Sequence, residues 1–147
     1  MSKHIFSSLR WCLVGLVTTI TFTPSVGQSA DKVLDTARRL YAAEKYDSTI
    51  TVLGTYVKKH GTDPSMEKIV PLLAESLVRV GKYSNFGNLF NIYRKQYPRS
   101  DFMPRLFYLE GVVAAREQRY VDAVEAFSEA LRAGAVPPVD SLALEGA

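Results

Sequence analysis

The sequence predicts an all-α protein built from a repeated helix–turn–helix unit. Tyr46, Tyr83 and Tyr120 stand 37 residues apart. Apolar residues recur at helical spacing from Val33 onward, without any sustained strand-like alternation. A fixed period of this size is typical of one supersecondary unit stacked on copies of itself.

The period extends to the residues around each tyrosine. Small residues let two paired helices approach closely, and a large apolar residue fills the groove beside them. Seven residues after each tyrosine stand Leu53, Phe90 and Phe127, and nine residues before it stand Ala37, Ala74 and Gly111. Three residues after the tyrosines stand Thr49, Phe86 and Ala123. We expect the two larger of these, Thr49 and Phe86, to splay the first two pairs slightly.

Breaks in the apolar pattern define three pairs of helices. Asp63-Pro64 and Ser100-Asp101 are typical of helix starts, and Gly61 and Gly134 of helix ends. Pro71 should either begin a regular helix or kink a longer one, because it lacks an N–H. The predicted helices span residues 32–44 and 47–60, 66–80 and 84–97, and 102–117 and 121–133.

The third copy carries a family resemblance. Its sequence of Gly111, Tyr120, Ala123, Phe127 and Ala130, followed by Pro137, resembles the tetratricopeptide repeat. The usual repeat has 34 residues, so each junction here carries about three extra. The alternative is an ordinary helical bundle with coincidental spacing.

The resemblance covers roughly residue 31 to the C-terminus and implies a solenoid of three full repeats plus a truncated fourth. Leu144-Glu145-Gly146 copies Leu109-Glu110-Gly111, which indicates that a fourth repeat has begun. This last segment is either a cap or the start of a longer array, and its open end offers a route to self-association. The expected repeats are approximately 31–63, 64–100, 101–137 and the partial 138–147.

Residues 1–30 have the layout of a secretory signal peptide. Basic residues precede a largely apolar run at residues 11–22, and small residues follow Pro24. This order predicts a periplasmic or secreted protein, with cleavage after Gly27 or Ala30. A spanning helix needs about 20 apolar residues, so no stable membrane insertion is expected after cleavage. An uncleaved signal that anchors the protein is the alternative.

Cleavage also changes the charge of the protein. Loss of Lys3 and Arg10 leaves 16 basic against 15 acidic side chains in the mature region. This near-neutral balance, together with export, argues against a nucleic-acid partner. The only cysteine, Cys12, is removed as well, so the mature region has no disulfide framework.

The sequence lacks the patterns that carry chemistry. His60 is the only histidine of the mature region, and it fits the negative end of a helix better than a catalytic role. No second histidine or cysteine completes a zinc site or a cysteine–histidine pair. Glu75 and Arg79, four residues apart, are interpreted as an ordinary surface pair. We therefore expect no enzyme activity, catalytic residue, cofactor or metal.

The tetratricopeptide resemblance implies that the first helix of each pair lines a concave groove. The residues at the groove positions of this sequence are mostly basic and aromatic. Such a groove suits acidic or C-terminal peptide segments, because arginine binds carboxylate with two bonds and tyrosine supplies rigid contact area. The alternative is that these charges form a solvated face. The predicted groove residues are Arg38, Tyr41, Lys68, Glu75, Arg79, Arg105, Tyr108, Val112 and Arg116.

These observations predict a non-enzymatic protein-binding scaffold or adaptor of the bacterial cell envelope. The chain resembles periplasmic tetratricopeptide proteins that organise envelope assembly. Arg38 and Glu75 stand where the chaperone-tail clamp of some family members needs asparagines, so that ligand is not expected. The alternative function is the docking segment of a larger exported enzyme, such as a peptidase, whose catalytic part follows Ala147.

Overall fold

The computed structural model describes residues 29–134 and places six α-helices in them. Each helix begins and ends within two residues of its predicted bounds, and the described residues contain no strand. The predicted signal peptide lies outside this range except for Ser29 and Ala30, and the partial fourth repeat lies wholly outside it. The helices are α1 (Ala30–Ala42), α2 (Tyr46–His60), α3 (Met66–Arg79), α4 (Tyr83–Gln96), α5 (Met103–Arg116) and α6 (Tyr120–Arg132).

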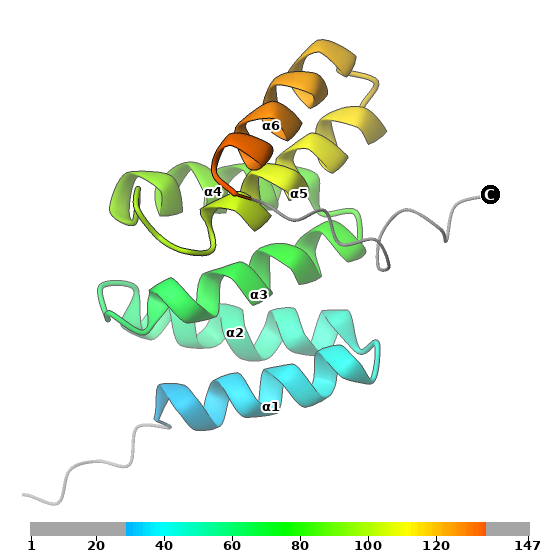
Figure 1. The fold of residues 1–147 in the computed structure, drawn as a ribbon. Coiled ribbons are helices and arrows are strands. Elements are labelled where there is room, and N and C mark those ends of the chain that lie inside the picture. The colour runs from blue at the N-terminus through cyan, green and yellow to red at the C-terminus, as the bar shows by residue number, and fades with distance from the viewer. Residues whose placement is uncertain (1–28, 135–147) are drawn as a thin grey trace, which may run out of the picture.

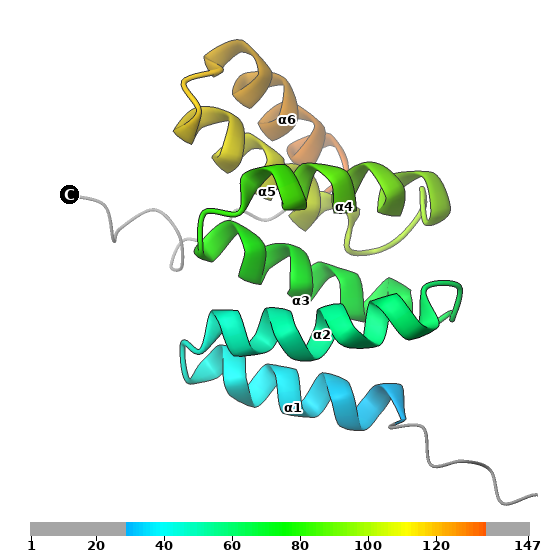
Figure 2. The ribbon, with the colours of Figure 1, turned by 180° about the vertical axis from the view of Figure 1, so that it is seen from behind.

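The helices form three antiparallel pairs stacked in chain order. Figure 1 shows α1, α3 and α5 on the near side, and Figure 2 shows α2 and α4 in front when the molecule is seen from behind. Buried side chains from the successive pairs form one continuous core, with Leu53, Ile69 and Leu106 fully excluded from solvent. No helix between residues 29 and 134 is both long and apolar enough to cross a membrane.

The turn within each pair confirms the repeat, because its backbone recurs at the 37-residue period. Each turn contains one residue in the left-handed region: Glu44 at φ 57°, Gly81 at φ 74° and Gln118 at φ 61°. Each also contains a backbone hydrogen bond of 2.8–2.9 Å across the helix end, from Lys45 to Leu40, from Lys82 to Leu77 and from Arg119 to Ala114. These are the features of a Schellman-type helix end, so all three copies leave the first helix in the same way.

The small residue predicted in the third pair is required by close packing. A Cβ added to Gly111 would lie 2.6 Å from the Phe127 ring, well inside van der Waals contact. The contact between α5 and α6 is the most extensive of any helix pair, in line with the small residues Gly111 and Ala123. Phe127 itself is only partly buried, unlike Leu53 and Phe90, because no helix among the described residues covers the far side of α6.

The third pair is inclined to the four helices before it (Figures 1 and 2). The sequence gives a physical reason. On α2, Ile50 and Val57 pack against the core at the junction with α3. The equivalent positions of α4 hold Gly87 and Arg94, which provide no such apolar surface. Contact between α4 and α5 is accordingly much less extensive than contact between α2 and α3.

Candidate functional site: a basic hollow between the first helices

The first helices of the three pairs enclose a hollow of about 510 Å³. Three cations and one carboxylate surround an apolar floor, so the hollow carries a net positive charge. We call it the basic hollow. Its lining residues are Leu34, Arg38, Tyr41, Lys68, Pro71, Leu72, Glu75, Phe102 and Arg105.

The hollow brings together five of the nine residues predicted for a groove: Arg38, Tyr41, Lys68, Glu75 and Arg105. The apolar floor was not predicted. Part of this floor could have been predicted from the repeat. Leu34 and Pro71 stand at the same repeat position as the predicted groove residue Tyr108, at intervals of 37 residues.

Glu75 is buried and not at the surface, where its pair with Arg79 was predicted. Its residue exposure is only 5%, and its carboxylate accepts a hydrogen bond of 2.5 Å from Nη2 of Arg105 on α5. The interpretation as a surface pair was wrong because α3 lies between α1 and α5, so its face toward the hollow is covered. A buried carboxylate is costly unless it is paired, and the ion pair with Arg105 joins the second and third repeats.

Tyr41 links the hollow to the turn of the first repeat. Burial raises the pKa of its hydroxyl to about 12, and the nearby Glu75 carboxylate adds to the shift. The Tyr41 ring meets Tyr46 edge to face at a centroid distance of 5.2 Å. The Arg79 guanidinium lies 5.9 Å above the Tyr46 ring. Burial lowers the pKa of Arg79, but its favourable interactions with the neighbouring Tyr41, Tyr46 and Glu75 outweigh burial and raise that pKa. Arg79 therefore sits beside the hollow, among aromatic rings.

The remaining predicted groove residues do not line the hollow. The Tyr108 ring packs against Phe127 at a centroid distance of 5.5 Å. Val112 is half-buried against the core, and Arg116 is exposed in the last turn of α5. Only the N-terminal part of α5 reaches the hollow, which follows from the inclination of the third pair.

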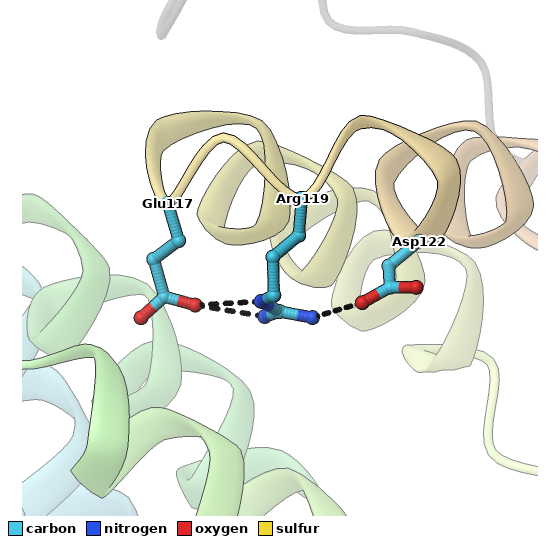
Figure 3. A network of polar contacts seen from close by, with 3 residues as sticks. All are labelled: Glu117, Arg119 and Asp122. Carbon is cyan, nitrogen blue, oxygen red and sulfur yellow. Dashed lines mark hydrogen bonds and ion pairs between the residues drawn. The ribbon is translucent and has the colours of Figure 1, made fainter.

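A second hollow, of about 460 Å³, lies between α4, α5 and α6, where that inclination separates them. Arg119 crosses its edge and joins two carboxylates (Figure 3). Its Nε and Nη2 donate to Glu117 at 3.1 and 2.8 Å, and its Nη1 donates to Asp122 at 2.5 Å. Burial raises the pKa of Glu110 inside this hollow. The lining residues are Arg94, Phe107, Glu110, Arg119, Asp122, Glu125, Ala126 and Glu129.

The described residues contain no cluster of three or more histidine, cysteine or acidic side chains that could hold a metal ion. His60 ends α2, and its ring stacks on Tyr56 at a centroid distance of 4.4 Å. No family model, curated protein or solved structure matches the chain.

Proposed function

We propose that the protein is a non-enzymatic scaffold of the tetratricopeptide type, which binds acidic segments of partner proteins in the basic hollow. The partner segment would place carboxylates against the cations at the rim and apolar side chains on the floor. We also propose that the protein is exported and acts in the bacterial cell envelope.

The observation that carries this proposal is the position of Arg38 and Lys68 around an apolar floor. Both side chains are exposed, and they extend from different repeats toward the same hollow. Arg38 has a weak exposed contact of 3.7 Å with Asp35. No ion pair engages Lys68 among the described residues. Pro71, Leu72 and Phe102 supply an apolar surface between the two cations.

The third cation of the hollow, Arg105, has a structural role. Arg105 neutralises Glu75, so the charge offered to a ligand comes mainly from Arg38 and Lys68. A carboxylate held by two such cations gains charge-assisted hydrogen bonds. The turns that recur every 37 residues and the stacked helix pairs support the tetratricopeptide type. Stacked-repeat proteins present extended surfaces for binding.

Export is proposed from the layout of residues 1–30. Of the two predicted cleavage points, the one after Gly27 would leave the first turn of α1 complete. Val33 donates its backbone N–H to the carbonyl of Ser29, and Ala30 packs against the core. N-terminal sequencing of the protein purified from its native host should therefore begin at Gln28. A chain that retains Met1 in the membrane would contradict export with cleavage.

Binding can be tested with three labelled peptides of equal length, built on the same leucine and alanine frame. The first carries glutamates, the second glutamines and the third lysines at the same positions. Fluorescence anisotropy should show the glutamate peptide binding at least about tenfold tighter than the glutamine peptide, and the difference should shrink as salt is added. Equal affinities for all three peptides would contradict the proposal.

A further inference from the structure

The basic hollow lies close to the last of the described residues. Phe102 and Arg105, at the beginning of α5, line the hollow. Because α5 and α6 form an antiparallel pair in extensive contact, the end of α6 lies beside this part of α5 (Figures 1 and 2). The chain that follows Gly134 therefore leaves α6 close to the hollow.

The two segments outside the described residues differ in charge. Residues 1–28 contain basic side chains and no acidic one, whereas residues 135–147 contain Asp140 and Glu145 and no basic one. The hollow presents positive charge at its rim. Of these two segments, segment 135–147 is therefore the one whose charge is complementary to the hollow.

Segment 135–147 also matches the apolar floor of the hollow. Its two leucines, Leu142 and Leu144, stand between the two carboxylates in the sequence. The floor offers Pro71 and Phe102, and 37% of Phe102 is exposed. Contact between the leucines and Phe102 would remove apolar surface of both from water, which favours binding.

The link between α6 and the carboxylates is long enough to reach the hollow. Asp140 follows Gly134 by six residues, and an extended chain spans at most about 3.3–3.6 Å per residue. Paired helices lie only about 8–10 Å apart, so this link can pass the beginning of α5. Pro137 and Pro138 restrict the backbone of the link, which lowers the entropy that it loses on docking.

Attachment to the same chain favours this segment over the same segment of a second copy. A short link gives a tethered segment an effective concentration in the millimolar range. Separate copies in a dilute solution do not reach that concentration. A contact too weak to hold a free peptide can therefore fill the hollow from within the chain.

We propose that segment 135–147 binds in the basic hollow of its own chain. Asp140 and Glu145 would face the exposed cations Arg38 and Lys68, and the leucines would lie on the apolar floor. This occupancy rests on the proposed function, because the same cations and floor would bind an acidic partner. The segment then competes with partner proteins, so that only ligands able to displace it are retained.

Zero-length cross-linking tests the contact without any partner. A carbodiimide joins a carboxylate to an amine when the two are in contact, and Lys68 supplies an amine to the lining of the hollow. Mass spectrometry of the cross-linked full chain should detect Lys68 joined to Asp140 or Glu145. Lys95 is the matched control, since it is exposed in the last turn of α4 and does not line the hollow. Its cross-links to segment 135–147 should be at least about tenfold less abundant.

A mixture of isotope-labelled and unlabelled chains shows whether the contact lies within one chain. Each cross-linked pair should hold two labelled or two unlabelled peptides. Mixed pairs would assign the segment to the hollow of a second copy and overturn the proposal. Arg38→Glu keeps the Lys68 amine but reverses a neighbouring charge, so it should lower the yield of the Lys68 cross-link at least about threefold.

Release of the segment should open the hollow to the labelled glutamate peptide. Asp140→Asn with Glu145→Gln removes both carboxylates and should tighten binding of that peptide at least about threefold, the change expected when the segment fills about two thirds of the hollows. Glu117→Gln with Glu125→Gln is the control, because both side chains are exposed outside the basic hollow and the net charge changes equally. This control should leave the affinity unchanged, and circular dichroism verifies that both variants are folded.

The two experiments separate occupancy by the segment from the proposed function. Suppose that the wild-type chain binds the glutamate peptide, that Lys68 and Lys95 cross-link equally, and that Asp140→Asn with Glu145→Gln gains nothing. The hollow would then be a partner site that the segment does not occupy, and the proposal would be overturned. A specific Lys68 cross-link without peptide binding to either chain would support the proposal and contradict the proposed function.

Discussion

Tyr93 of α4 supplies the hydrogen bond that Pro71 of α3 cannot make. In a regular helix, the N–H at position 71 would donate to the carbonyl of Glu67, but proline has no N–H. The Tyr93 hydroxyl donates to that carbonyl at 2.9 Å instead. The Ser100 hydroxyl lies 2.7 Å from the same Tyr93 oxygen, and both residues are buried. A proline in the interior of α3 is therefore compensated by a side chain from the next helix.

Removing this hydroxyl should destabilise the fold. Tyr93→Phe leaves the ring in place but strips the Glu67 carbonyl of its donor, which should cost about 1–3 kcal/mol in the free energy of unfolding. Restoring the backbone donor with Pro71→Ala should reduce that cost, because the new N–H can satisfy the same carbonyl. Urea unfolding of the two single variants and the double variant measures the coupling. Strictly additive effects would show that Tyr93 does not stand in for the missing N–H.

The sequence predicted the helix that contains Pro71 but could not decide what the proline does there. Periodicity and turn residues are local signals, and they placed all six helices to within two residues. The donor that resolves Pro71 lies 26 residues from Glu67 along the chain. No pattern at the proline itself indicates such a contact, since it depends on how α3 and α4 pack.

The left-handed turn residues give a second prediction. Glu44 and Gln118 adopt positive φ at positions where the second repeat has Gly81. A residue with a side chain in this left-handed region costs roughly 1–2 kcal/mol. Glycine removes that strain but loses more backbone entropy on folding. Glu44→Gly or Gln118→Gly should therefore raise the free energy of unfolding by up to about 1 kcal/mol. Gly81→Ala should lower it by about 1–2 kcal/mol.

The Gly81 substitution isolates the backbone effect. A Cβ at this position meets no atom within 4 Å, so steric overlap adds nothing to the strain. Gly54→Ala is the matched control, because Gly54 lies in the middle of α2 and also has open space around it. Alanine should stabilise the helix there. Equal changes for Gly81→Ala and Gly54→Ala in thermal melts would mean that the turn geometry is wrong.

Stability should fall steeply at alkaline pH. Burial is the main cause that raises the pKa of Tyr41 and of Tyr93 to about 12 from the ordinary value of 10.0. Between these pH values the unfolded chain loses the tyrosine protons while the folded protein keeps them, so the free energy of unfolding decreases as pH rises. Urea unfolding at a series of pH values from about 9 to about 12 would measure this decrease.

Substitution identifies the groups responsible. Tyr41→Phe and Tyr93→Phe should each make the decrease shallower, since each removes one proton that the folded state retains. Tyr120→Phe changes a ring that is 66% exposed and should leave the slope as it is in the wild-type protein. If all three variants followed the wild-type slope, other groups would control alkaline unfolding.

The site was less predictable than the fold. Transfer of groove positions between repeats found Arg38, Lys68 and Arg105 at the hollow, because the first helices follow the repeat register closely. It also included Tyr108, Val112 and Arg116, which lie outside the hollow. The third pair is inclined where α4, which carries Gly87 and Arg94, makes little contact with α5, and the sequence of the first helices alone does not indicate this. The burial of Glu75 likewise depends on its neighbours in space.

The central claim is that partner proteins bind through the basic hollow. We therefore compare the proteins retained from an envelope extract by the wild-type chain and by two charge-reversal variants, using quantitative mass spectrometry. The hollow variant is Arg38→Glu with Lys68→Glu, and the control is Lys58→Glu with Lys95→Glu on α2 and α4. All four side chains are exposed, so their reversal should change stability little, and circular dichroism verifies this.

If partner proteins bind through the basic hollow, the wild-type and control chains will retain the same proteins and the hollow variant will lose those with acidic segments. Retention of an unchanged set by the hollow variant, or loss caused by the control alone, would contradict it.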